Sequence, residues 1–156
     1  MAEWTSVTEQ TVQPGGSIVF TETRVPCTRG FVRHRDGDSD FLLSGWVPSR
    51  GCGCPCSHSA SATYFVDFGA NIAIPTGGEV GEISVAFALN GTPIPSTIMS
   101  VTPAAVEDYF NVSRASNVEI WKGCCQTVTI QNTSDQPILV KNANIDFTRP
   151  DLSVSY

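Results

Sequence analysis

The chain has 156 residues, of which 41% are hydrophobic and only 15% are charged, and its formal net charge at pH 7 is −6. This length suits a single domain, which can bury about two-thirds of the surface of the unfolded chain. The charged fraction is lower than the roughly 25% of an average soluble domain, which favours a surface that contacts another surface. The lysines are Lys122 and Lys141 alone, so the chain lacks a basic stripe that could neutralise phosphates, and nucleic acid is excluded as an expected partner.

The first residues contain neither a basic region nor an apolar run of signal-peptide length, and no apolar stretch approaches the length of a membrane span. We therefore expect no signal peptide and no membrane partner. A role outside the cell would follow assembly inside a cell and lysis. Residues 1–14 precede a Gly-Gly turn and are predicted to form an N-terminal arm.

Turn signals divide the first half of the chain into predicted strands. A first strand is expected after the Gly-Gly turn, up to about Thr23. Residues 31–35 and 41–46 indicate a hairpin around an acidic turn. A cysteine-rich loop at residues 51–61 follows, and β-branched and aromatic residues then predict a strand over 62–74.

The second half alternates apolar and polar residues between turns, which is the pattern of antiparallel strands. A strand over 82–89 is predicted to end at the tight-turn dipeptide Asn90-Gly91, and residues 102–110 are predicted to form one short helical turn. Further strands are expected near residues 98–101, 112, 118–121, 126–131 and 138–147. Seven to nine short strands indicate an all-β antiparallel jelly-roll sandwich, with residues 15–156 as one domain.

Three segments of this half resemble the last strands of TNF/C1q-like jelly-roll domains. They are Ala88-Leu-Asn-Gly-Thr-Pro-Ile-Pro, Gln126-Thr-Val-Thr-Ile-Gln-Asn-Thr-Ser and Asn142-Ala-Asn-Ile-Asp-Phe. Bacterial members of this family cap exosporium and collagen-like fibres, and similar domains occur on virions. The whole sequence also resembles proteins of phages and prophages of gut Firmicutes. The resemblance implies a homotrimer and a place on a virion that assembles in the host cytoplasm.

The cysteines are the next signal, and they are accompanied by one histidine. The set comprises Cys27, Cys52, Cys54, Cys56, Cys124, Cys125 and His58. Zinc takes four thiolate or imidazole ligands, so zinc at this cluster is one interpretation, and no other cofactor is expected. Disulfides are the competing interpretation, and each would contribute about 2 to 4 kcal/mol by tying the loop 51–61 to the sheet. Reduced thiols are the third.

Catalysis by a cysteine needs a base, and Cys56 lies two residues from His58. However, the chain has no Gly-X-Ser-X-Gly elbow, no glycine-rich phosphate loop and no His-Glu-X-X-His motif. We therefore predict that the protein is not an enzyme.

The acidic turn offers three alternating carboxylates, Asp36, Asp38 and Asp40, as calcium loops do. An EF-hand loop requires glycine at its sixth position and glutamate at its twelfth, but Phe41 and Val47 stand there. A solvated hairpin turn is the competing interpretation.

Aromatic residues are candidates for an interface because they supply large apolar contact areas. The candidates are Trp4, Trp46, Trp121 and Tyr109, whereas Phe65, Phe87 and Phe147 are expected in the core. The features together favour a non-enzymatic structural protein, a trimeric capsid decoration or fibre component that contacts other virion proteins. The alternative function is a receptor- or glycan-binding module on a virion or cell surface.

Overall fold

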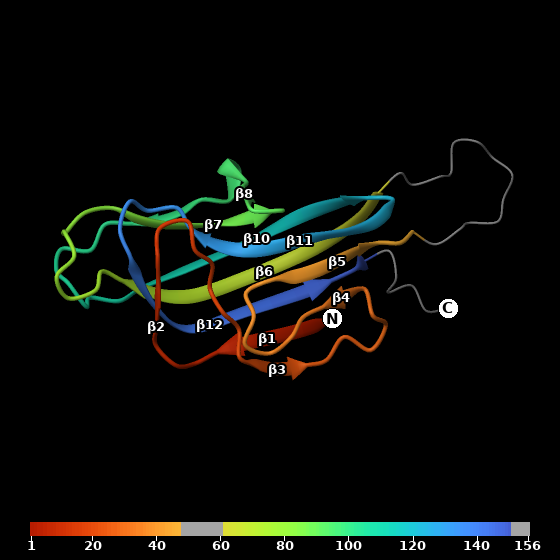
Figure 1. Cartoon of the computed structure of the whole chain (residues 1–156), viewed down its shortest axis with the longest axis horizontal. Coiled ribbons are helices and arrows are strands. Elements are labelled where there is room, and N and C mark those ends of the chain that lie inside the picture. The colour runs from red at the N-terminus through yellow and green to blue at the C-terminus, as the bar shows by residue number, and fades with distance from the viewer. Residues whose placement is uncertain (48–60, 151–156) are drawn as a thin grey trace, which may run out of the picture.

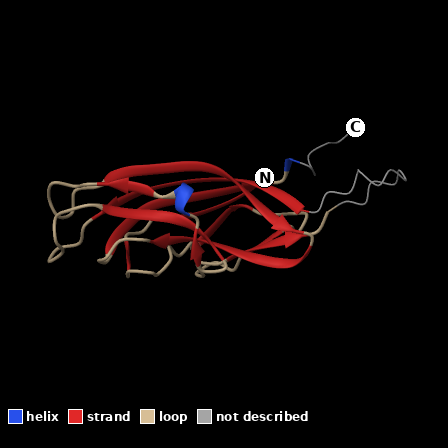
Figure 2. Ribbon diagram, turned by 90° about the horizontal axis from the view of Figure 1, so that it is seen from above, coloured by secondary structure: helices blue, strands red, loops and turns tan. Residues whose placement is uncertain are grey.

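The structure, a computed structural model, describes residues 1–47 and 61–150 (Figure 1). Two antiparallel sheets pack face to face, with their strands along the length of the molecule (Figure 2). Within the described residues there are twelve strands and one short 3₁₀ helix, Pro95–Thr97. The prediction of an all-β jelly-roll sandwich is confirmed. The strand count exceeds the predicted seven to nine because several strands have only two or three residues.

The first sheet, here sheet A, has the strand order β10-β6-β12-β1-β3, and β2 also pairs with β12. Its strands are β1 (Ala2–Ser6), β2 (Gln10–Val12), β3 (Glu22–Val25), β6 (Ser61–Ala73), β10 (Phe110–Trp121) and β12 (Ile138–Thr148). Sheet B has the order β4-β5-β11-β7-β8, and β9 also pairs with β7. Its strands are β4 (Val32–Arg33), β5 (Phe41–Gly45), β7 (Ile83–Leu89), β8 (Thr92–Pro93), β9 (Met99–Val101) and β11 (Gly123–Asn132).

The core lies between the sheets and is filled by alternate residues of their strands. In β6, Tyr64, Val66 and Phe68 are buried while the residues between them face outward. Phe87 and Phe147 are fully buried, as predicted. Each such side chain contributes about 1.5 to 3 kcal/mol by leaving water, so the alternating pattern is sufficient to hold the two sheets together.

The N-terminal segment belongs to sheet A, which corrects the expectation of an arm over residues 1–14. Strand β1 pairs with β12 in continuous register from Ala2–Phe147 to Ser6–Ala143. Trp4 is only 3% exposed, and its ring packs edge-on against Phe41 at 5.2 Å between ring centroids. Trp4 therefore lies in the core of this chain, which corrects its place among the interface candidates. The sequence pattern missed this strand because its inward residues include only one large apolar side chain.

Two other local expectations are corrected. The predicted strand up to Thr23 is replaced by an isolated bridge between Ser17 and Gln131, and β3 begins only at Glu22. Residues 102–109 form turns in place of the predicted helical turn, and Glu107 has a left-handed φ of 57°. This segment crosses from β9 in sheet B to β10 in sheet A, and that change of direction overrides the helical capping signal.

The predicted hairpin around the acidic turn and the predicted tight turn at Asn90-Gly91 are confirmed, and the strand expected near residues 98–101 is β9, which also pairs with β7. Strands β4 and β5 pair on either side of the acidic turn. Strands β7 and β8 pair across Asn90 and Gly91, whose φ angles are 50° and 82°. Positive φ at both central residues is the geometry that matches the twist of a hairpin, and Asn-Gly is the dipeptide that adopts it most readily.

Candidate interaction surface

The face of sheet A that points away from the core, here called the outer face, extends over β10, β6, β12 and β1. Residues directly opposite each other in a sheet share a face, so the register of the strands identifies its rows. Along its β10 edge Ser113 lies opposite Gly69, and Ala115 lies opposite Asp67. This edge of the outer face therefore carries small side chains at Gly69, Ser113 and Ala115.

Gly69 makes this part of the outer face flatter because it has no side chain. No tight contact requires a glycine at this position. A methyl group added at Gly69 would lie 3.9 Å from the Cβ of Ser113, an ordinary van der Waals distance. Ser113 and Ala115 are exposed. Another sheet or chain can therefore approach the backbone of β6 and β10 closely at this point.

A row of three carboxylates crosses the outer face and ends at Asp67, the residue opposite Ala115. Glu3, Asp146 and Asp67 lie directly opposite one another on the adjacent strands β1, β12 and β6. Glu3 accepts a hydrogen bond from the amide of Asn144, and a guanidinium nitrogen of Arg24 lies 3.7 Å from its Oε1.

The pKa of the middle carboxylate of this row, Asp146, is raised. Oδ1 of Asp146 is buried and has no hydrogen-bond partner among the described residues. Burial raises the pKa of Asp146, and the charges of Glu3 and Asp67 raise it further, against the opposing effects of Arg24 and the N-terminus. Burial and the two neighbouring carboxylates thus favour the protonated form of Asp146.

Two exposed aromatic residues lie on the outer face near one end of the sheet. Phe65 is 41% exposed and lies opposite Thr148 and Asn117, which corrects the expectation that it fills the core. Trp121, the last residue of β10, is 63% exposed and lies opposite Ser61. The outward position of Phe65 was not predicted because apolar residues in β6 occur at both inward and outward positions. Only the apolar neighbours Tyr64 and Val66, which would share the inward face, indicated that Phe65 points outward.

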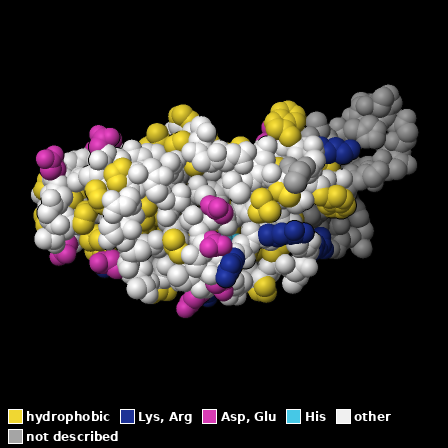
Figure 3. All heavy atoms as spheres, viewed as in Figure 1, with side chains coloured by type: hydrophobic (Ala, Val, Ile, Leu, Met, Phe, Trp, Pro, Cys, Tyr) yellow, Lys and Arg dark blue, Asp and Glu magenta, His cyan; other side chains and the backbone are white. Residues whose placement is uncertain are grey.

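Charged side chains are few on the side of the molecule that Figure 3 presents, where uncharged polar atoms and scattered apolar side chains cover most of the surface. This agrees with the low charged fraction of the sequence. Such a surface loses little solvation of charge when it is covered by another protein.

The two remaining interface candidates differ in exposure. Trp46 is 58% exposed just beyond the end of β5. Tyr109 is half-buried, donates a hydrogen bond to the carboxylate of Glu9, and has the ammonium of Lys141 3.9 Å above its ring. Burial raises the pKa of Tyr109, and the hydrogen bond to Glu9 adds to this effect. Tyr109 therefore holds parts of its own subunit together.

The acidic turn does not gather its carboxylates into a cation site. Asp36 accepts a hydrogen bond of 2.7 Å from Thr23, whereas Asp40 accepts one of 3.2 Å from Ser39. Among residues 1–47 and 61–150, no three His, Cys, Asp or Glu side chains lie close enough to hold a metal ion. Asp36, Asp38 and Asp40 are thus part of a solvated hairpin turn.

The structure describes only part of the cysteine cluster. Cys52, Cys54, Cys56 and His58 lie outside the described residues. Cys27 is half-buried against the core, Cys125 is exposed, and both Cys124 and Cys125 belong to β11. Zinc and disulfides both remain predictions.

In the part of the chain that the structure describes, no helix has the length and apolar character needed to span a membrane.

Comparisons with known proteins concern the fold. The sequence matches no protein-family model and no curated protein sequence. The structure is similar to the globular domain of zebrafish complement 1qA protein, with a TM-score of 0.53 and 9% identity over 93% of this chain and 94% of that one. A Podospora anserina GH26-CBM35 β-(1,4)-mannanase also matches, with a TM-score of only 0.33 and 14% identity over 91% of this chain and 28% of that one. The fold is that of a TNF/C1q-like jelly roll.

Proposed function

We propose that this chain is a non-enzymatic structural module that assembles as a homotrimer through the outer face of sheet A. The observation that carries the proposal is the strip of small side chains along the β10 edge of that face, formed by Gly69, Ser113 and Ala115, with Phe65 and Trp121 exposed on the same face. A flat sheet face can supply the roughly 800 Å² per partner that a stable interface buries. The trimeric state is supported by the C1q-like fold, since such domains typically form homotrimers.

The native mass of the purified chain tests this proposal, and the expected value is three times the 16.7 kDa of one chain. The variant Ser113→Arg places a long cation on the strip of small side chains of the outer face and should dissociate the trimer. Ser96→Arg is the matched control, because Ser96 is exposed in the 3₁₀ helix on the side of sheet B. A monomeric wild type would refute the trimer, and a trimeric Ser113→Arg would refute this face as its interface.

Within this proposal the module is a capsid decoration or fibre component of a virion. The support is the resemblance of the sequence to phage and prophage proteins. Mass spectrometry of purified particles from a lysed host culture that carries the gene should find the chain in a fixed ratio to the capsid protein. Particles that lack the chain would contradict this role, without affecting the trimer.

Recognition of a ligand on a host surface is a second candidate function. It is favoured by the exposed indole ring of Trp46, because aromatic rings stack on the apolar faces of sugar rings. Loss of binding to host cells in Trp46→Ala, with unchanged assembly, would support it. Equal binding by this variant and the wild type would count against it.

A further inference from the structure

A closed trimer needs two different surfaces on each subunit, and the outer face of sheet A is only one of them. In a dimer with twofold symmetry a surface can meet its own copy, whereas in a ring of three each contact joins one surface of a subunit to a different surface of the next. The outer face must therefore meet a second surface of the neighbouring subunit. The assignment of this second surface rests on the proposed homotrimer.

The surface that borders the outer face along β10 is the open edge between the two sheets. Strand β10 is the last strand of sheet A, and among the described strands it pairs with β6 alone. A hollow of about 360 Å³ is lined by residues 98–101, in and beside β9 of sheet B, and by residues 111–114 of β10. These two ranges are here called the β9–β10 edge. Ser113 belongs both to this edge and to the strip of small side chains, so the two surfaces are adjacent.

Arg114 is the one charged residue among those that line the β9–β10 edge. It lies opposite Phe68, whose side chain is buried in the core, so its position faces inward. Arg114 is nevertheless exposed, and no hydrogen bond or ion pair joins it to another described residue. Its guanidinium therefore has five N–H donors to offer at the open edge.

Arg114 also decides which kind of contact this edge can make. A long unpaired edge strand can add a strand from another chain, and an inward-pointing charge is one of the devices that prevent such pairing. The position of Arg114 therefore disfavours a continuous sheet across two subunits. It favours a contact through side chains, in which the edge lies against a face.

The carboxylate row of the outer face offers the matching acceptors. Asp67 is exposed and has no hydrogen bond or ion pair with another described residue. Oδ1 of Asp146 is buried and has no partner among the described residues. In the described part of the chain, only Glu3 of this row forms an ion pair, with Arg24. Two neighbouring carboxylates with free acceptors are complementary to a guanidinium, which can bond both.

Arg114 and the carboxylate row lie at nearly the same level along the strands. Ala115 is directly opposite Asp67, so one residue, or about 3.4 Å along the strand, separates Arg114 from the row. The strands run along the length of the molecule (Figure 2). Rotation about a threefold axis parallel to the strands keeps each residue at its level. It therefore brings Arg114 of one subunit to the level of Asp67 and Asp146 of the next.

We propose that the β9–β10 edge of each subunit docks on the outer face of the next subunit, with Arg114 bonded to the carboxylates of Asp67 and Asp146. The strip of small side chains lies beside this contact and allows the subunits to approach closely. Ile98, which is 43% exposed, gives the same edge an apolar contact. Complementary charges fix the register of an interface, so the pairing selects this arrangement over other contacts of the outer face.

Reversal of the charge of Arg114 tests the pairing by analytical ultracentrifugation. Arg114→Glu brings a carboxylate to the row of carboxylates, so it should raise the protein concentration at which half of the trimer dissociates by about tenfold or more. Arg33→Glu is the matched control and should have no effect, because Arg33 is an exposed arginine on β4, at the other end of sheet B from β9. Both arginines are exposed, so both variants should melt like the wild type at a concentration where all three are monomeric.

Exchange of the two charges distinguishes a direct contact from a general effect of charge. Asp67→Arg alone should also weaken the trimer, because it brings a cation to Arg114. The double variant Arg114→Glu/Asp67→Arg should dissociate at a concentration closer to that of the wild type than either single variant does. Arg114→Glu combined with Asp38→Arg, in the exposed acidic turn, has the same net charge and should not be restored. Within one chain Arg114 and Asp67 lie on opposite faces of sheet A, so restoration requires a contact between subunits.

The outcomes separate this pairing from the homotrimer itself. A wild-type trimer that Arg114→Glu does not weaken refutes the pairing and leaves the homotrimer intact, and so does a double variant that assembles no more tightly than the single ones. A monomeric wild type refutes both. A dimeric wild type also refutes both, because a twofold contact lets the outer face meet its own copy.

Discussion

Asp146 shows how three neighbouring strands change the chemistry of one side chain. A carboxyl group with a higher pKa in the folded than in the unfolded chain favours folding most when it is protonated. For Asp146 that contribution is fully present below the ordinary pKa of 3.8 and is lost as the pH rises through the higher folded-state pKa. Ionisation of Asp146 therefore opposes folding.

Asp146→Asn should raise the melting temperature at pH 7 and leave it unchanged near pH 3. Because Asp146 is only partly buried, the gain in the free energy of unfolding should be no more than about 1 kcal/mol. Thermal melts at one low protein concentration measure it. Asp38→Asn, in the exposed turn, is the control and should show no such difference. A lower melting temperature for Asp146→Asn at pH 7 would contradict the expected sign.

Tyr64 and Tyr109 allow the contribution of a buried hydroxyl group to stability to be compared with that of a partly exposed one. Tyr64→Phe removes a fully buried donor from the carbonyl oxygens of Phe31 and Ser44 and should cost about 1 to 3 kcal/mol. Tyr109→Phe removes a bond to Glu9 at the surface and should cost less than about 1 kcal/mol. Urea unfolding of both variants measures the difference. Equal costs would show that burial does not decide the contribution of these hydroxyls.

Among the elements, the β7–β8 hairpin depends most directly on its turn residues. Gly91→Ala forces a side chain onto a φ of 82° and should destabilise the chain by about 1 kcal/mol. Gly81→Ala is the control, because Gly81 has no positive φ and no neighbouring atom within 4 Å of an added Cβ. Chemical denaturation should show a loss for Gly91→Ala and no loss for Gly81→Ala. A neutral Gly91→Ala would mean that the turn changes type at little cost.

Strands with strong alternation were predictable from sequence, and those without it were not. Strand β12 alternates between buried and half-buried residues from Ala143 to Thr148, after an irregularity between Lys141 and Asn144. Strand β1 escaped prediction because its pairing with β12 joins opposite ends of the chain, and no local pattern reports such a contact. The residue pattern predicted that β6 is a strand, but it did not predict whether Tyr64 or Phe65 faces the core.

At the scale of the whole molecule, assembly predicts a melting temperature that depends on concentration. A homotrimer is stabilised by mass action, so the wild type should melt at a higher temperature as its concentration rises. Ser113→Arg should lose this dependence, and Ser96→Arg should retain it. Differential scanning calorimetry over a hundredfold concentration range measures it. A wild type whose melting temperature does not change with concentration would argue against reversible assembly.

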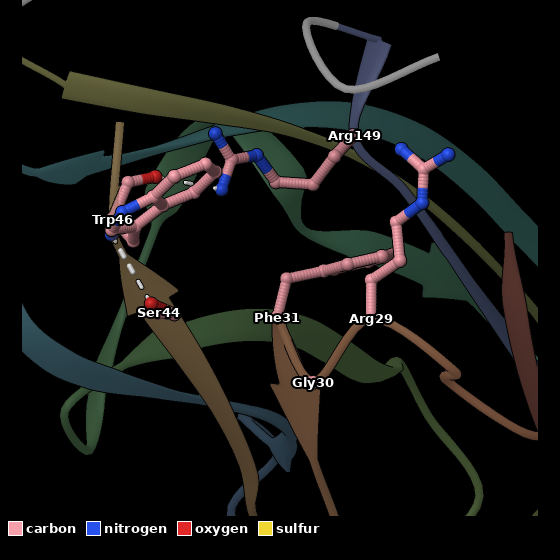
Figure 4. A pocket seen from close by; sticks show the side chains of 6 residues that line it. All are labelled: Arg29, Gly30, Phe31, Ser44, Trp46 and Arg149. Carbon is pink, nitrogen blue, oxygen red and sulfur yellow. Dashed lines mark hydrogen bonds between the residues drawn. The ribbon is translucent and has the colours of Figure 1, made fainter. Parts of the chain in front are cut away.

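The fold as a whole was accessible from the sequence, but the surfaces that distant residues form together were not. Alternation and turn chemistry indicate a jelly roll because they are local properties of each strand. Arg29, Trp46 and Arg149 line one hollow where β5 and β12 end (Figure 4), but nothing in their sequence spacing joins them. The outer face has the same difficulty, because Gly69 and Ser113 become neighbours only through the register of β6 and β10.

The central places of β11 and β12 decide when this chain can fold during its synthesis. Strand β12 separates β6 from β1 in sheet A, and β11 separates β5 from β7 in sheet B. Until these last two strands leave the ribosome, each sheet consists of two pieces with no partner between them, and their inner strands expose unpaired edges. Folding of this domain is therefore completed only after β12 has left the ribosome, and a ribosome stalled before Gly123 would hold a chain with open edges in both layers.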